Sequence, residues 1–204
     1  FYLELISYCF KILSRLFQFS TKLINYRAGQ ILYYCTYNPE DYFCHFDDKV
    51  GVSAFELVYT ILLNCEQATY YTFLLCDEFN FLEILYNAIT KGSYFIVYPA
   101  SMSLLKIIEG CSDENDRFIN ENVFEALLKM MLMDNINIQK KAINAISIIF
   151  ERSNNNSDSD VEKCITAFDI NDGVSIFANC LYSSKNVEIS QCCNRFLLRF
   201  FPVE

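Results

Sequence analysis

Two segments of the C-terminal half align without a gap: NINIQKKAINAISIIF at 135–150 and NVEISQCCNRFLLRFF at 186–201. Each begins with Asn, a β-branched residue, a polar residue and Ile. Apolar residues then follow a small residue (Ala142 or Cys193) three, four and seven positions later, which is the spacing of one face of a helix. A chain that repeats one amphipathic helix is expected to stack its copies side by side.

The same pattern recurs upstream, in CFKILSRL, AFELVYTI and SMSLLKII. The small residues of the five copies are Cys9, Ala54, Ser101, Ala142 and Cys193. Their spacings are 45, 47, 41 and 51 residues, whereas repeats built from two or three helices run at about 40–47 residues. We therefore expect one helical unit per copy, with one long connector before the last.

Other apolar segments predict further helices in each repeat. A second helix is expected before each of the last four copies, at 30–37, 82–90, 124–132 and 174–182. A third, shorter helix is expected at 69–79, 112–121 and 158–168. The run SNNNSDSD at 153–160 predicts a loop, which would account for the longest spacing.

Composition supports a fold made only of helices. The 204 residues include 5 Gly and 3 Pro, fewer than the turns of an antiparallel β fold require. The apolar N-terminal stretch carries Glu4, Lys11 and Arg15, which argues against a transmembrane helix. Because the chain has no initiator Met, we expect it to be a piece of a longer protein.

Three helices per repeat, the last one long and bearing a small residue, resemble the armadillo family. The resemblance is best where 123–150 stands beside 174–201, and the related two-helix HEAT repeat is the alternative. It implies a single domain over 1–204, a right-handed α-solenoid of about four repeats. The repeats would span 1–20 (partial), 21–66, 67–111, 112–152 and 158–204.

The armadillo resemblance also implies a concave groove, lined by the last helix of each repeat, that holds an extended peptide. Import receptors of that family carry Trp and Asn ladders in the groove, but this chain has no Trp and keeps neither ladder. The alignment gives the candidate partner-binding residues Lys11, Arg15, Glu56, Ser103, Asn144, Arg195 and Arg199. Arg can hold carboxylates or phosphates with two hydrogen bonds, so an acidic or phosphorylated peptide is the expected ligand. The alternative is that these are solvated positions on helix surfaces.

Charge and cysteine usage limit the other classes of partner. The net charge of −9 disfavours nucleic acid and anionic membranes, both of which attract basic proteins. Most of the ten cysteines, such as Cys9, Cys35, Cys65, Cys76 and Cys180, lie in apolar runs, where we expect small buried side chains. We expect a reducing, intracellular and cytoplasmic location.

We predict no catalytic residue, no cofactor and no metal site. The single histidine, His45, lies in the segment CHFDD, whose spacing suits neither a zinc site nor a nucleophile pair. The glycines form no phosphate-binding loop. An enzyme with an unrecognised helical active site is the alternative from another class.

The expected function is therefore that of a non-enzymatic scaffold for protein–protein interaction. The alternative within binding proteins is a regulatory domain of a larger protein, of the formin or phosphatase-subunit kind. Self-association is a further expectation, because Phe196, Phe200 and Phe201 end the chain with no following repeat to cover them.

Overall fold

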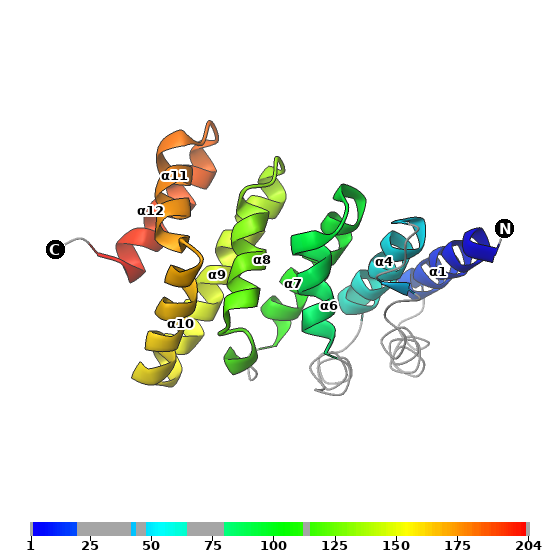
Figure 1. The fold of residues 1–204 in the computed structure, drawn as a ribbon, viewed down its shortest axis with the longest axis horizontal. Coiled ribbons are helices and arrows are strands. Elements are labelled where there is room, and N and C mark those ends of the chain that lie inside the picture. Colours follow the sequence, from blue (N-terminus) through cyan, green and yellow to red (C-terminus); the bar gives the residue numbers. More distant parts are fainter. Residues whose placement is uncertain (1, 20–41, 44–47, 65–79, 112–114, 203–204) are drawn as a thin grey trace. The chain divides into compact units, whose positions relative to one another are not determined.

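The computed structural model describes residues 2–19, 42–43, 48–64, 80–111 and 115–202. Within these ranges the chain is all-α, with nine α-helices, one short 3-10 helix and no strand (Figure 1). It divides into two compact units, Phe1–Cys111 and Ser112–Glu204.

The N-terminal unit is a layer of long helices with one shorter helix beside it. Its helices are α1 (Tyr2–Phe19), α4 (Asp48–Asn64), α6 (Phe81–Lys91) and α7 (Tyr94–Gly110). α4 packs against α1 on one side and against α7 on the other, while α6 pairs with α7. The hydroxyls of Ser7 and Ser53 lie 2.8 Å apart between α1 and α4, so these two helices approach closely.

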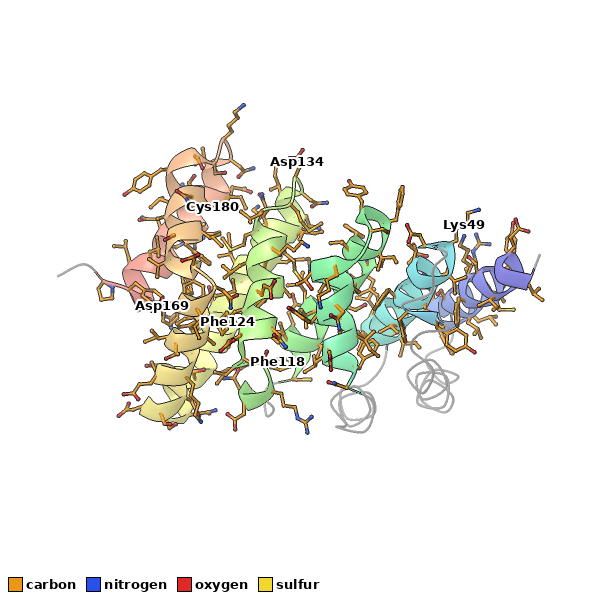
Figure 2. All side chains as sticks on the ribbon, viewed as in Figure 1. Lys49, Phe118, Phe124, Asp134, Asp169 and Cys180 are labelled. Carbon is orange, nitrogen blue, oxygen red and sulfur yellow. The ribbon has the colours of Figure 1, made fainter. Side chains whose placement is uncertain are left out.

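The C-terminal unit contains two helical hairpins and a helix packed against both. Its elements are η1 (Asn115–Arg117), α8 (Glu121–Met131), α9 (Ile136–Asn156), α10 (Asp158–Ile170), α11 (Gly173–Ser183) and α12 (Val187–Phe200). α8 pairs with α9 and α11 with α12, while α10 packs against α8, α9 and α11. Phe124, labelled on α8 in Figure 2, is completely buried in this core.

Phe150 is the centre of the aromatic core of the C-terminal unit. Its ring lies 5.1 to 5.9 Å, between centroids, from five other rings contributed by α8, α10, the α12 helix and the residue after it. These are the rings of Phe124, Phe168, Phe196, Phe200 and Phe201. Of the phenylalanines expected to form an uncovered terminal face, Phe196 is only 2% exposed, whereas Phe200 and Phe201 remain partly exposed.

The two aligned segments begin at equivalent points of their helices. Asn135 and Asn186 are both N-caps, whose side-chain oxygens accept hydrogen bonds from Ile138 N (3.1 Å) and Ile189 N (3.2 Å). An Asn oxygen at this position satisfies one of the free amides of the first turn. The shared Asn thus starts the same kind of helix twice.

The run at 153–160 is not the loop that its composition predicts. α9 continues to Asn156, Ser157 is the only residue between the helices, and α10 begins at Asp158. Ser157 caps α10 by accepting a hydrogen bond from Asp160 N at 3.2 Å. Ser153 is buried, and its hydroxyl donates to Ile149 O one turn earlier in α9 and accepts from Asn115 Nδ2. The tertiary contact with Asn115 offsets the weak helix propensity of the Asn and Ser residues.

The predicted inner face of α1 is also wrong. The pattern from Cys9 placed Ile12 and Leu16 inside, but Cys9 is exposed and these two side chains are 56% and 49% exposed. Phe10 and Phe17 are buried instead. Apolar residues lie around most of α1, so the helical period alone could not select the face that meets α4.

The structure tests some of the other expectations, and some fall outside the residues that it describes. In place of the short helix expected at 112–121, the described part of that segment has only η1 and the start of α8. Cys180 is only partly buried. The expected helices at 30–37 and 69–79 lie outside the described residues, as do the following side chains: Cys35, Cys65, Cys76 and His45. None of the described helices combines the length and apolar character needed to cross a membrane.

Truncating Phe150 should strongly destabilise the C-terminal unit. Phe150→Ala removes a 2%-exposed ring and leaves a cavity, which typically costs about 3–5 kcal/mol. Tyr182→Ala, at a residue that is 86% exposed, should change the free energy of unfolding by less than about 0.5 kcal/mol. Urea unfolding followed by circular dichroism measures both, and similar values for the two variants would contradict this core.

Gly173 is required by close packing at the start of α11. A Cβ atom at this position would lie 2.5 Å from the buried Phe168 ring. Gly173→Ala should therefore destabilise the unit by about 1–3 kcal/mol, as overpacking does. Ser175→Ala, at an exposed position of the same helix, is the control and should be neutral or slightly stabilising in the same unfolding measurement.

Candidate functional site

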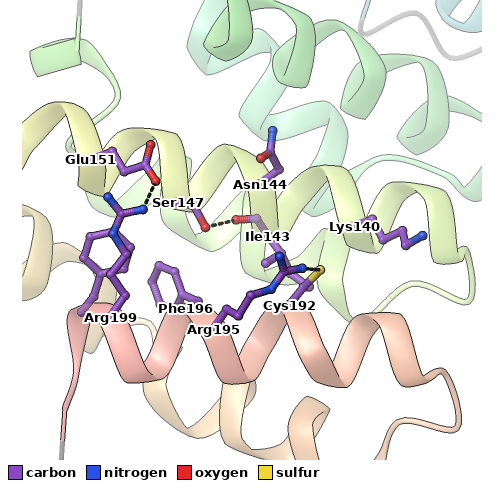
Figure 3. Close-up of a pocket in the computed structure, with 10 residues that line it drawn as sticks. Lys140, Ile143, Asn144, Ser147, Glu151, Cys192, Arg195, Phe196 and Arg199 are labelled. Atoms are coloured by element: carbon purple, nitrogen blue, oxygen red, sulfur yellow. Dashed lines mark hydrogen bonds and ion pairs between the residues drawn. The ribbon is translucent and has the colours of Figure 1, made fainter.

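A pocket of about 250 Å³ lies between α9 and α12 (Figure 3). We call it the α9–α12 pocket. Its polar lining consists of Lys140, Asn144, Ser147, Glu151, Arg195 and Arg199. Ile143, Phe196 and Phe200 contribute apolar surface, and Phe196 is almost fully buried. The pocket thus offers charged and amide groups around an apolar floor.

Two ion pairs connect α9 to α12. Lys140 pairs with Glu188, and Glu151 pairs with Arg199. Both pairs join residues 48 positions apart in the sequence, so the two helices run parallel and in a constant register. Figure 3 shows Lys140 towards one end of the pocket and the Glu151–Arg199 pair at the other. Pairs as exposed as these stabilise a fold only weakly, but they fix which side chains face each other.

The middle of the pocket contains polar groups with weak internal contacts. The Arg195 guanidinium donates only long hydrogen bonds of 3.4 Å, to Gln191 O and to Cys192 Sγ. Within the described residues it has no carboxylate partner. The Asn144 side chain is exposed and has no hydrogen-bond partner among those residues either. Arg195 and Asn144 are therefore available to an external ligand.

One of the cations that line the pocket lies close to an aromatic ring. The Arg199 guanidinium carbon lies 5.2 Å from the centroid of the Phe200 ring. A cation in this position is attracted by the face of the ring. Together with the ion pair to Glu151, this contact restrains Arg199.

The structure brings three of the seven predicted site residues together. Asn144, Arg195 and Arg199 all line the α9–α12 pocket. Lys11, Arg15 and Glu56 lie at exposed positions of α1 and α4 in the N-terminal unit.

Ser103 cannot contact a partner from the surface, which corrects its assignment to the groove. Its side chain is 0% exposed. Its hydroxyl donates to Pro99 O at 2.9 Å, one turn earlier in α7. In the sequence alignment Ser103 is the equivalent of Asn144. In α7, however, this position faces the neighbouring helix α4, where Phe55 O also accepts a hydrogen bond from Ser103.

The alignment of small residues missed Lys140, Ser147 and Glu151. They lie four residues before, three after and seven after Asn144, so they share its face of α9. This helical spacing was present in the sequence and could have found them. What the spacing could not show is that α12 presents Arg195 and Arg199 opposite that face.

A second hollow of about 640 Å³ lies between the start of α8 and α10. None of the predicted site residues lines it. Its walls include the exposed Ile170 and the Lys163 side chain, which pairs with Asp160. In the described part of the chain, no cluster of three His, Cys, Asp or Glu side chains could hold a metal ion.

Comparisons with known proteins identify a fold and no family. No family model matches the chain, and no curated protein matches it. Two crystal structures of engineered proteins are similar to it in fold. One has a TM-score of 0.56 at 15% identity, covering 95% of this chain and 89% of that one. The other has a TM-score of 0.55 at 14% identity, covering 97% and 92%. At these identities the likeness extends to the helical architecture alone.

A double-mutant cycle would test the register of α9 against α12. Glu151→Gln and Arg199→Gln, alone and combined, should give a coupling energy of about 0.2–1 kcal/mol, which shrinks as salt is added. Glu151→Gln combined with Lys185→Gln is the control, because Lys185 lies outside the pocket, and it should show no coupling. Equal coupling in the two cycles would show that Glu151 and Arg199 do not face each other in solution.

Proposed function

We propose that this chain is a non-enzymatic protein-interaction scaffold that binds an acidic or phosphorylated segment of a partner protein. The contact would be made on the face formed by the last helix of each repeat, with the α9–α12 pocket as one of its points. The proposal includes a right-handed α-solenoid of about four armadillo-like or HEAT-like repeats. In such stacks, cores are buried between neighbours and an extended surface is left for recognition.

The lengths and order of the helices support a repeat architecture. α6, α8 and α11 each have eleven residues. Each is followed, after a short connector, by the helix with which it pairs: α7, α9 or α12. The small residues Ser101, Ala142 and Cys193 are all 0% exposed, one on each of these partner helices. Equivalent burial at equivalent positions is what stacked copies of one unit would show.

The observation that carries the functional proposal is the state of Arg195. It is an exposed guanidinium with no carboxylate partner in the described chain, and Asn144, whose amide has no hydrogen-bond partner there, lines the same pocket. A guanidinium can hold a carboxylate or a phosphate through two parallel hydrogen bonds. An Asn amide offers one acceptor and two donors, which suits the backbone of an extended peptide.

The charges around the pocket favour an anionic ligand. Lys140, Arg195 and Arg199 outnumber the two carboxylates, Glu151 and Glu188, that pair with the outer cations. The chain as a whole is acidic, with a net charge of −9. At physiological ionic strength, charges further away than roughly 8 Å are largely screened, so the local excess of cations decides.

A peptide-binding measurement with three probes tests the proposal. Short fluorescent peptides rich in glutamate, phosphoserine or lysine are titrated with the protein, and fluorescence anisotropy reports binding. The two anionic peptides should bind and the lysine peptide should not. Arg195→Glu should weaken binding by roughly tenfold or more, because a charged hydrogen bond contributes about 1.5–3 kcal/mol.

Lys185→Glu is the matched control, since it makes the same change of charge at an exposed residue outside the pocket. It should leave the affinity within about twofold, given screening by salt. Equal losses in the two variants would indicate a general charge effect and would contradict binding at the pocket. The absence of any anion preference would overturn the proposed ligand class.

A further inference from the structure

Two cysteine thiols meet between α11 and α12. Cys180, marked on α11 in Figure 2, and Cys193 on α12 share a side-chain hydrogen bond. The two helices pack closely along the hairpin that joins them. Both cysteines are free thiols in the structure. Phe177 and Phe196 lie three residues away from them on the same two helices, and their ring centroids are 4.3 Å apart, so the pairing of α11 with α12 places Cys180 opposite Cys193.

The two thiols differ in their access to solvent. Cys193 is 0% exposed, whereas Cys180 is only partly buried. A small oxidant can therefore reach Cys180, while Cys193 lies behind it. We propose that Cys180 and Cys193 form a peroxide-oxidisable pair, in which Cys180 reacts first and Cys193 closes a disulfide that ties α11 to α12. This inference is independent of the proposed function.

The chemistry needs hydrogen peroxide as its only co-reactant. The Cys180 thiolate attacks one peroxide oxygen; an S–O bond forms, the O–O bond breaks, and the leaving hydroxide takes up a proton as water. The sulfur is now a sulfenic acid, oxidised by two electrons. Cys193 sulfur then attacks Cys180 sulfur, so an S–S bond forms and the S–O bond breaks. The departing hydroxide takes the Cys193 proton, and the net products are one disulfide and two waters.

The hydrogen bond between the thiols supports these two roles. It lowers the pKa of Cys180 to about 7, because the Cys193 S–H donates to the Cys180 thiolate. The same bond, together with burial, raises the pKa of Cys193. About half of Cys180 is therefore thiolate at neutral pH, and the thiolate is the form that attacks peroxide.

Two neighbouring cysteines provide internal controls. Cys164 on α10 is 0% exposed, and burial raises its pKa to about 12, so it should react slowly. Cys192 precedes Cys193 in the sequence but contacts the Arg195 guanidinium in the α9–α12 pocket at 3.4 Å. The oxidation of Cys164 and Cys192 can therefore be compared with that of Cys180 in the same sample.

Peptide mapping after mild peroxide treatment tests the proposal. The full chain is oxidised, its remaining thiols are alkylated, and it is digested with trypsin without reduction. Cleavage after Lys163, Lys185 and Arg195 releases the peptides 164–185 and 186–195. Mass spectrometry should find these two linked by a disulfide, and dithiothreitol should separate them.

Four variants assign the sulfurs. Cys164→Ala and Cys192→Ala should keep the link, whereas Cys180→Ala and Cys193→Ala should lose it. Cys193→Ala should fold normally, because Ala142 occupies the equivalent position of α9. In that variant Cys180 should accumulate as a sulfenic acid that dimedone labels, at least about tenfold more than Cys164, since thiolate character controls reactivity.

Three results would overturn the inference. One is a link that persists in Cys193→Ala, which would point to Cys192. Another is a link that is lost in Cys164→Ala. The last is the absence of any link in a protein whose circular dichroism shows that it remains folded during oxidation.

Discussion

The close approach of the long helices is the constraint on which the other features of each unit depend. Ala54, Ser101, Ala142 and Cys193 are 0–1% exposed, and each lies where a helix meets its neighbour. A small side chain at such a point lets the two backbones come together, so the larger apolar residues beside it can interdigitate. In the C-terminal unit this brings the Phe150 ring among its aromatic partners.

The same approach creates the pocket. Because α9 and α12 run parallel, with residues 48 positions apart facing each other, their outward faces lie side by side and line one pocket. Asn144 and Arg195 each lie two residues after the small residue of their helix, and Arg199 lies six residues after Cys193. In the N-terminal unit the equivalent residue, Ser103, is turned inward against α4. Aligned positions of different helices therefore do not guarantee identical exposure, because the rotation of each helix depends on the neighbours it packs against.

The errors of the sequence analysis have two physical causes. The run 153–160 has the composition of a loop, yet Ser153 accepts a hydrogen bond from Asn115 that only the folded unit supplies. In α1, by contrast, there are more apolar residues than buried positions, so the helical spacing of apolar residues matched more than one face of the helix. Local propensity is weak compared with tertiary contacts in the first case, and periodicity is ambiguous in the second.

The sequence by itself determined the all-helical class of fold and the starts of α9 and α12, since helical spacing and Asn caps are local properties. It also pointed to Asn144, Arg195 and Arg199 as surface residues. Only the tertiary structure decided that these three share one pocket and that Cys180 meets Cys193. Both facts depend on how two helices far apart in the chain, or joined by a turn, are rotated against each other. That rotation depends on the packing of all the neighbouring helices, so no single segment of the sequence determines it.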